Sequence, residues 1–174
     1  MVIGAFFSEV GAKLLDILSG LDPDTENLQR ELASGDGSPA EEYEKLIRWV
    51  GNNDYTLEAK NVDWEDLKTY LAQRRDFLLR LLENPSLLEH EKFTGVLRAV
   101  FHLAEELEAR ADMRGLPDED FQHLHGDMRR VYRPLAHKWL DYMKHLKSSY
   151  PYLFSLAMRT NPFNRNASPV LGRT

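Results

Sequence analysis

Residues 118–149 read DEDFQHLHGDMRRVYRPLAHKWLDYMKHLKSS. Apolar side chains recur through this segment at intervals of three or four residues: Phe121, Leu124, Met128, Val131, Leu135, Trp139, Tyr142 and Leu146. Such spacing places them on one face of a helix, in a seam close to a heptad repeat. Pro134 lies inside the segment and removes a backbone donor there, which kinks a helix. The pattern therefore predicts one bent helix, or two, between Asp118 and Ser149.

Helical spacing also continues upstream of this segment. Asp63 is a typical N-cap for a long helix that ends before Pro85. Ser86 begins the next capping signature, and the apolar stripe that follows it ends at Gly115. Together with residues 118–149, these segments predict three long amphipathic helices.

The remaining chain predicts shorter helices at both ends. An N-terminal helix ends near Gly20, Asp22-Pro23 begins a short one, and Ser38 with Glu41 forms a capping box for another. A Ser/Gly-rich loop, residues 34–38, separates the last two. The sequence thus predicts an all-α helical bundle over residues 1–163, with a C-terminal arm and a mobile tail over 164–174.

The chain has 174 residues, is 43% apolar, and contains no cysteine, which excludes a disulfide scaffold, thiol catalysis and Cys-ligated zinc. Its apolar N-terminus meets Glu9, Lys13 and Asp16 before it reaches the length of a membrane span. The net charge of −6 argues against nucleic-acid binding by the whole molecule. We therefore expect a cytoplasmic protein.

Charge is distributed unevenly along the chain. Residues 128–174 hold nine of the 22 Lys and Arg but only one of the 28 Asp and Glu. Such a basic end can dock on acidic helices of the same or a neighbouring chain, or face an anionic membrane surface. The candidate partner- or anion-binding residues are Arg129, Arg130, Arg133, Lys138, Lys144, Lys147 and, on the seam between Leu71 and Leu78, Arg74. For Arg74, a side chain that extends to solvent at the bundle edge is the alternative.

Six histidines between His90 and His145 raise the question of a metal site. His102 with Glu106, Glu119 with His123, and His123 with Asp127 are pairs four residues apart, close enough on a helix to share an ion. The sequence contains neither the Glu-x-x-His motif of di-iron bundles nor His-Glu-x-x-His. We expect no cofactor and take solvated or capping pairs as the alternative. The candidate metal ligands are His102, Glu106, Glu119 and His123.

Three stretches, Leu81–Glu91, Ala99–Leu107 and His145–Phe163, resemble the cytosolic region of a family of prokaryotic ion-channel proteins with a two-helix, potassium-channel-type pore. The chain departs from that family in having no pore helix and no Thr-Val-Gly-Tyr-Gly-like filter. The resemblance implies a role in channel assembly or gating.

Three hypotheses about function follow. The first is a non-enzymatic, homo-oligomeric assembly or regulatory module at the cytoplasmic face of the membrane, associated with an ion channel. The second is a helical protein that binds a small molecule or a metal, and this hypothesis includes an enzyme. The third is a phospholipid- or RNA-binding protein that uses the basic C-terminal region.

Overall fold

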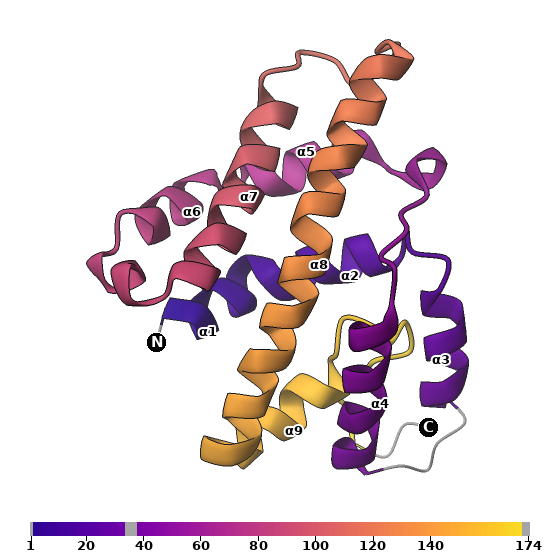
Figure 1. Ribbon diagram of the computed structural model, residues 1–174, viewed down its shortest axis with the longest axis vertical. Coiled ribbons are helices and arrows are strands. Elements are labelled where there is room, and N and C mark those ends of the chain that lie inside the picture. The colour runs from indigo at the N-terminus through magenta and orange to yellow at the C-terminus, as the bar shows by residue number, and fades with distance from the viewer. Residues whose placement is uncertain (1, 34–37, 172–174) are drawn as a thin grey trace.

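The computed structural model describes residues 2–33 and 38–171, and most of the predicted loop 34–38 lies outside that range. Within it the structure contains helices and connecting segments and no strand, which confirms the all-α class. The long helix α8, Asp118–Ser149, runs the length of the molecule beside α7, Glu91–Glu108 (Figure 1). The two helices run in opposite directions because the short segment 109–117 turns the chain back on itself.

One continuous helix of 32 residues forms from the segment that predicted one helix or two. Most of its seam is buried, and Leu124, Met128, Val131 and Leu135 are all 0% exposed. Phe121 and Tyr142 are half-buried, and Met143, next to Tyr142, is fully buried. Pro134 is exposed, so its ring lies on the outer side of α8, away from the seam. The apolar stripe of α7 buries Phe93, Leu97, Val100, Leu103 and Leu107 against this seam and the neighbouring helices.

The segment expected to form one long helix after Asp63 is two shorter helices, α5 (Trp64–Ala72) and α6 (Arg75–Leu82). The chain turns between them, where the Arg74 N–H donates to the Leu71 carbonyl. This interruption keeps Leu71 and Leu78 buried on either side while Arg74, which would otherwise fall on the apolar seam, stays half-buried. Both helices pack beside α7.

The N-terminal helix is continuous from Val2 to Ser19 but widens in its middle. A π-helical turn, Phe7–Gly11, joins α1 (Val2–Phe6) to α2 (Ala12–Ser19), which crosses α8. Gly11 permits close packing here, because a Cβ atom at this position would lie 2.7 Å from ring atoms of both Phe6 and Phe7.

Shorter elements complete the bundle around α8. The Ser38 and Glu41 capping box is present at the start of α4. The remaining elements are α3 (Thr25–Ala33), α4 (Pro39–Asn52), α9 (Pro151–Arg159) and the 3-10 turns Ala59–Asn61 and Pro85–Glu89.

The end of the chain packs against the bundle. The Phe163 ring is fully buried, with its centroid 5.2 Å from that of Trp49 and 5.5 Å from that of Trp139. Two residues later, Arg165 Nη1 lies 2.7 Å from Asp16 Oδ1. The domain boundary at residue 163 and the mobility of residues 164–174 stay predictions.

The close packing at Gly11 gives a test of the fold. We expect Gly11→Ala to lower the free energy of unfolding by about 1–3 kcal/mol, because the added methyl group overpacks two buried rings. Gly95→Ala is the matched control on α7: no atom lies within 4 Å of its added Cβ, and alanine favours helix by about 0.5–1 kcal/mol. Urea unfolding of the two variants should therefore shift in opposite directions, and equal shifts would contradict this packing.

Candidate metal centre

Two pairs of metal-binding residue types face each other across the α7–α8 interface. His102 and Glu106 lie one turn apart on α7, and His123 and Asp127 lie one turn apart on α8, so each pair shares a helix face. The antiparallel register then places His102 beside Asp127 and Glu106 beside His123. Four side chains therefore converge at one edge of the seam.

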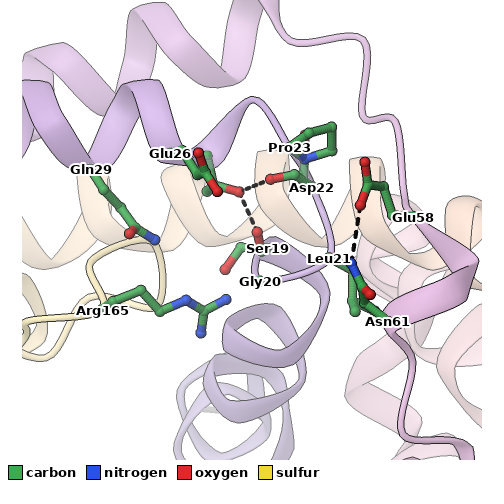
Figure 2. Close-up of a pocket in the computed structure, with 11 residues that line it drawn as sticks. Ser19, Gly20, Leu21, Asp22, Pro23, Glu26, Gln29, Glu58, Asn61 and Arg165 are labelled. Carbon is green, nitrogen blue, oxygen red and sulfur yellow. Dashed lines mark hydrogen bonds between the residues drawn. The ribbon is translucent and has the colours of Figure 1, made fainter.

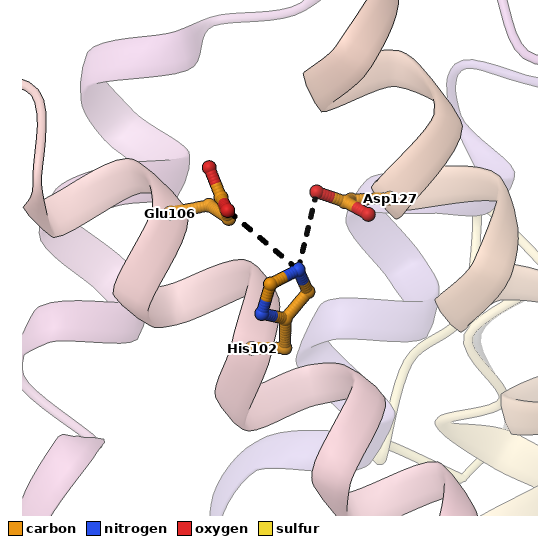
Figure 3. A group of neighbouring side chains, drawn as sticks. All are labelled: His102, Glu106 and Asp127. Carbon is orange, nitrogen blue, oxygen red and sulfur yellow. Dashed lines mark ion pairs between the residues drawn. The ribbon is translucent and has the colours of Figure 1, made fainter.

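Three of these residues form a group that could hold a metal ion (Figure 3). One donor atom from each of His102, Glu106 and Asp127 can be chosen so that all three lie within 4.8 Å of one another. His102 Nε2 is 3.7 Å from Glu106 Oε1 and 3.6 Å from Asp127 Oδ2. A single ion in their midst can contact all three.

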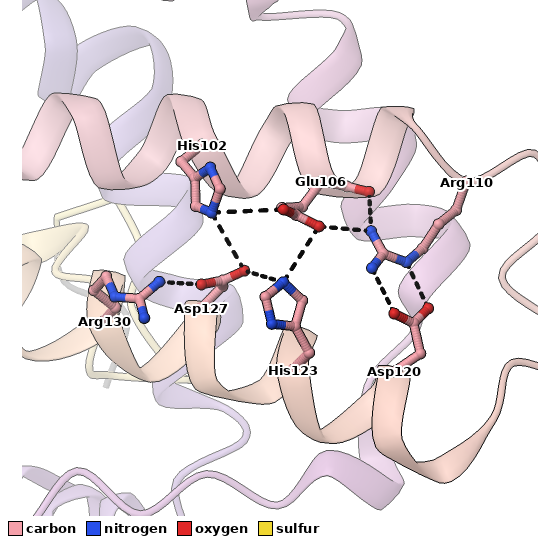
Figure 4. Close-up of polar contacts among 7 residues, drawn as sticks. All are labelled: His102, Glu106, Arg110, Asp120, His123, Asp127 and Arg130. Carbon is pink, nitrogen blue, oxygen red and sulfur yellow. Dashed lines mark hydrogen bonds and ion pairs between the residues drawn. The ribbon is translucent and has the colours of Figure 1, made fainter.

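His123 supplies a fourth donor from the side of α8 (Figure 4). Its Nε2 atom is 3.4 Å from Glu106 Oε2 and 3.4 Å from Asp127 Oδ2. Bond lengths of about 2.0–2.1 Å at a tetrahedral zinc ion put neighbouring donors about 3.3–3.4 Å apart. The four contacts in this group measure 3.4–3.7 Å, and they involve both oxygens of Glu106: Oε1 faces His102 and Oε2 faces His123.

The Asp127 carboxylate is the buried member of the group. Its side chain is 2% exposed, and its Oδ1 atom accepts a hydrogen bond from Arg130. Its Oδ2 atom is buried and has no hydrogen-bond partner among the described residues. A buried carboxylate oxygen without a partner is costly, so this atom favours a hydrogen-bond donor or a cation beside it. An imidazole N–H or a metal ion can fill that role.

Arg110 fixes the second carboxylate. Its Nη1 atom lies 2.9 Å from Glu106 Oε2, while Nε and Nη2 each donate to Asp120 at 2.6 Å. The guanidinium group lowers the pKa of Glu106 and of Asp120 through these hydrogen bonds, which keeps both carboxylates charged. All three nitrogens of Arg110 are used in this way. Outer contacts of this kind orient the ligands of metal sites.

The charges around the group leave room for a divalent cation. Glu106, Asp120 and Asp127 contribute three negative charges, and Arg110 and Arg130 contribute two positive ones. With both imidazoles neutral, as metal binding requires, the net charge is −1. A divalent ion would change it to +1.

The structure brings together three of the four candidate ligands predicted from sequence. His102, Glu106 and His123 meet, whereas Glu119 is exposed and forms no ion pair within the described part of the chain. The fourth converging residue is Asp127, which the sequence pairs with His123 as close enough to share an ion but which was not among the candidate ligands. The useful signal is a His-x-x-x-Glu pair on one helix and a His-x-x-x-Asp pair on the next.

The basic candidates are divided among several sites. Lys138 Nζ lies 3.6 Å from Asp141 Oδ2, and Lys147 Nζ lies 3.9 Å from Glu44 Oε1 on α4. Exposed Arg129, Arg133 and Lys144 form no ion pair among the described residues. Arg74 lies at the bundle edge, where its guanidinium carbon is 4.9 Å from the Tyr70 ring centroid and its side chain donates to Gln73 and to the Glu9 carbonyl. Whether any of them binds an anion or a partner stays a prediction.

A polar pocket of about 300 Å³ lies elsewhere, where α2 meets α3 (Figure 2). Arg165 points into it, and Glu26 and Glu58 line its rim. The Arg165 side chain is already paired with Asp16 and covers Gly20. With both signs of charge and no converging donors, this pocket defines no ligand class.

Comparison with known proteins gives the family. None of the helices in the described residues combines the length and hydropathy needed to cross a bilayer. A family model described as "Uncharacterized protein MJ1433, C-terminal helical domain" matches residues 1–159. The "Uncharacterized protein MJ1433" of Methanocaldococcus jannaschii is 45% identical over 167 residues, which cover 96% of this chain and 67% of that protein. No solved structure matches.

These matches overturn the resemblance to ion-channel proteins. The family model and the archaeal relative both point to the MJ1433 C-terminal helical domain, and no ion-channel family matches the chain. The three stretches that carried the resemblance are parts of amphipathic helices and the turns beside them: the end of α6 with the 3-10 turn after it, the middle of α7, and the end of α8 with α9. Amphipathic helical segments of this kind occur in many unrelated bundles. The chain belongs to the family of the MJ1433 C-terminal helical domain.

Proposed function

We propose that this helical domain binds a divalent transition-metal ion between α7 and α8. His102, Glu106, His123 and Asp127 are its ligands. The observation that supports this proposal most strongly is the buried Asp127 Oδ2 atom, which has no hydrogen-bond partner in the described structure and faces two imidazole nitrogens at 3.4 and 3.6 Å. A metal ion at the centre would satisfy this oxygen and both imidazoles at once.

The donor set selects the class of metal. Two imidazoles and two carboxylates suit Zn²⁺, Fe²⁺ or Mn²⁺ better than Ca²⁺ or Mg²⁺, which prefer oxygen ligands alone. The two His123 contacts of 3.4 Å match the donor spacing of tetrahedral zinc, and the two His102 contacts, at 3.6 and 3.7 Å, are slightly longer. Among these ions, we therefore propose zinc as the one that binds. Because the ligands come from two helices, a bound ion would also join α7 to α8 near the turn between them.

The proposal predicts one bound zinc per chain and its loss on removal of a ligand. Purified protein is first freed of metal with excess chelator, and the chelator is removed. When this protein is titrated with Zn²⁺, it should bind one equivalent, measured by calorimetry and by elemental analysis. His102→Ala and Asp127→Asn should each weaken binding at least 10-fold, since each removes a ligand or its charge. His90→Ala is the matched control, because His90 is exposed and remote from the four ligands along α7.

Two results would refute the metal site. One is a wild-type protein that binds no zinc. The other is binding that His90→Ala weakens as much as His102→Ala does.

An assembly role is a second candidate function, and exposed apolar residues on α9 favour it. The Tyr152 side chain is 71% exposed and that of Leu156 is 44% exposed, next to a groove lined by Phe7, Trp139 and Leu153. Exposed apolar side chains beside a groove are typical of contact surfaces. A homo-oligomer formed through this face would fit the non-enzymatic module that the sequence favours.

Light scattering tests the assembly role directly. If copies of the chain associate through α9, the wild-type protein should have a mass above that of one chain. Leu156→Glu should reduce it to the single-chain mass, because the new charge would have to be buried. Glu105→Gln, an exposed charge change on α7, serves as the control. A wild-type protein that is already a monomer contradicts this role.

A further inference from the structure

We infer that a second site, a cavity between α1, the 3-10 turn Pro85–Glu89 and α8, binds a small organic acid: one carboxylate group carried on an apolar body. This inference is independent of the proposed metal centre. It is carried by the mostly covered ammonium group of Lys138, which lines a cavity that also has an apolar wall.

The cavity has the size of a small-molecule site. Its volume is about 610 Å³, within the range of about 300–1,000 Å³ that is usual for sites that bind small organic ligands. Lys138 follows Asp127 by 11 residues on α8 (138 − 127 = 11), which separates the two by about 16 Å along the helix axis. The cavity is therefore distinct from the candidate metal centre.

The wall of the cavity includes apolar side chains in fixed positions. Val2 and Ile3, at the start of α1, are half-buried and pack against the core. The Tyr142 ring of α8 is stacked on Phe7, with centroids 5.2 Å apart and planes 13° apart. Burial of these remaining apolar faces favours a ligand with a ring or a short hydrocarbon chain.

The charged group that is covered in this cavity is the Lys138 ammonium. Its side chain is 18% exposed, and Nζ lies 3.6 Å from Asp141 Oδ2, which places it at the Asp141 end of the cavity. Nζ donates no hydrogen bond to any described residue, although an ammonium group has three N–H donors. The Asp141 side chain is 68% exposed, and an ion pair with so exposed a carboxylate is weak. An oxygen anion in the cavity can therefore bind the free N–H donors of Lys138.

The other polar groups of the cavity favour a single negative charge on the ligand. Asp141 and Glu89 are exposed carboxylates, and they would repel a doubly charged phosphate more strongly than a monocarboxylate. A cationic amine would face the covered charge of Lys138. The imidazoles of His90 and His145 line the same cavity and offer N–H donors to a carboxylate when they are neutral.

Three probes that share one apolar body test the ligand class: phenylacetate, the uncharged phenylacetamide, and the cationic phenethylamine. Each is titrated into ¹⁵N-labelled protein and followed by the amide shifts of Val2, Ile3 and Tyr142. We expect saturable shifts with phenylacetate, about tenfold weaker binding of phenylacetamide because it lacks the charge that Lys138 binds, and no binding of phenethylamine.

Lys138→Met tests the residue, because methionine retains much of the apolar stem and removes the charge. It should weaken phenylacetate binding about tenfold and change phenylacetamide binding little. Lys144→Met is the matched control, since Lys144 is an exposed lysine of α8 that does not line the cavity. It should leave the affinity for both probes unchanged. Amide shifts far from the cavity show whether each variant is folded.

Three results would overturn the inference. One is the absence of saturable shifts with phenylacetate. Another is tighter binding of phenethylamine than of phenylacetate, which would mean that the exposed carboxylates determine the ligand. The third is equal weakening by Lys138→Met and Lys144→Met. If Lys138→Met does not fold, the three probes on the wild-type protein still decide the question. Zinc binding is measured separately, so either proposal can fail without the other.

Discussion

The packing of α7 against α8 is the constraint on which the rest of this domain depends. A helix of 32 residues cannot bury its apolar seam alone, and α7 covers the half that begins at Asp118. Each leucine-sized side chain buried in this way contributes about 1.5–3 kcal/mol. The remaining helices follow from this pair: α5 and α6 pack beside α7, while α2, α4 and α9 pack along α8.

The same packing determines the position of the candidate metal centre. Residues just outside the buried stripe of each helix lie at the edge of the interface, where two side chains one turn apart meet two from the other helix. His102 and Glu106 occupy that edge on α7, and His123 and Asp127 occupy it on α8. Arg110 binds Glu106 Oε2, which also faces His123, and Arg130 binds Asp127 Oδ1, so both carboxylates are held in place (Figure 4). The centre is thus a consequence of the helix register, with no dedicated loop or cleft.

Much of this fold could be predicted from sequence because helical spacing and capping residues are local signals. The α8 seam and the Ser38–Glu41 capping box are examples. The break before Arg75 was missed because the apolar spacing continues through it, and only the position of Arg74 on the seam indicated a problem. The metal ligands could be suspected in pairs but not assembled, since sequence fixes which residues share a helix face and not which faces meet. The roles of Arg110 and Arg130 depend on that same register.

The central claim is that a metal ion joins α7 to α8 at the buried Asp127 carboxylate. Crystals grown from zinc-loaded protein, with diffraction measured on both sides of the zinc absorption edge, test it most directly. The account predicts one anomalous peak within bonding distance of His102, Glu106, His123 and Asp127, at about 2.0–2.2 Å from each donor. Zinc bound only at other residues, with the Asp127 oxygen still facing two unmetallated imidazoles, would contradict it.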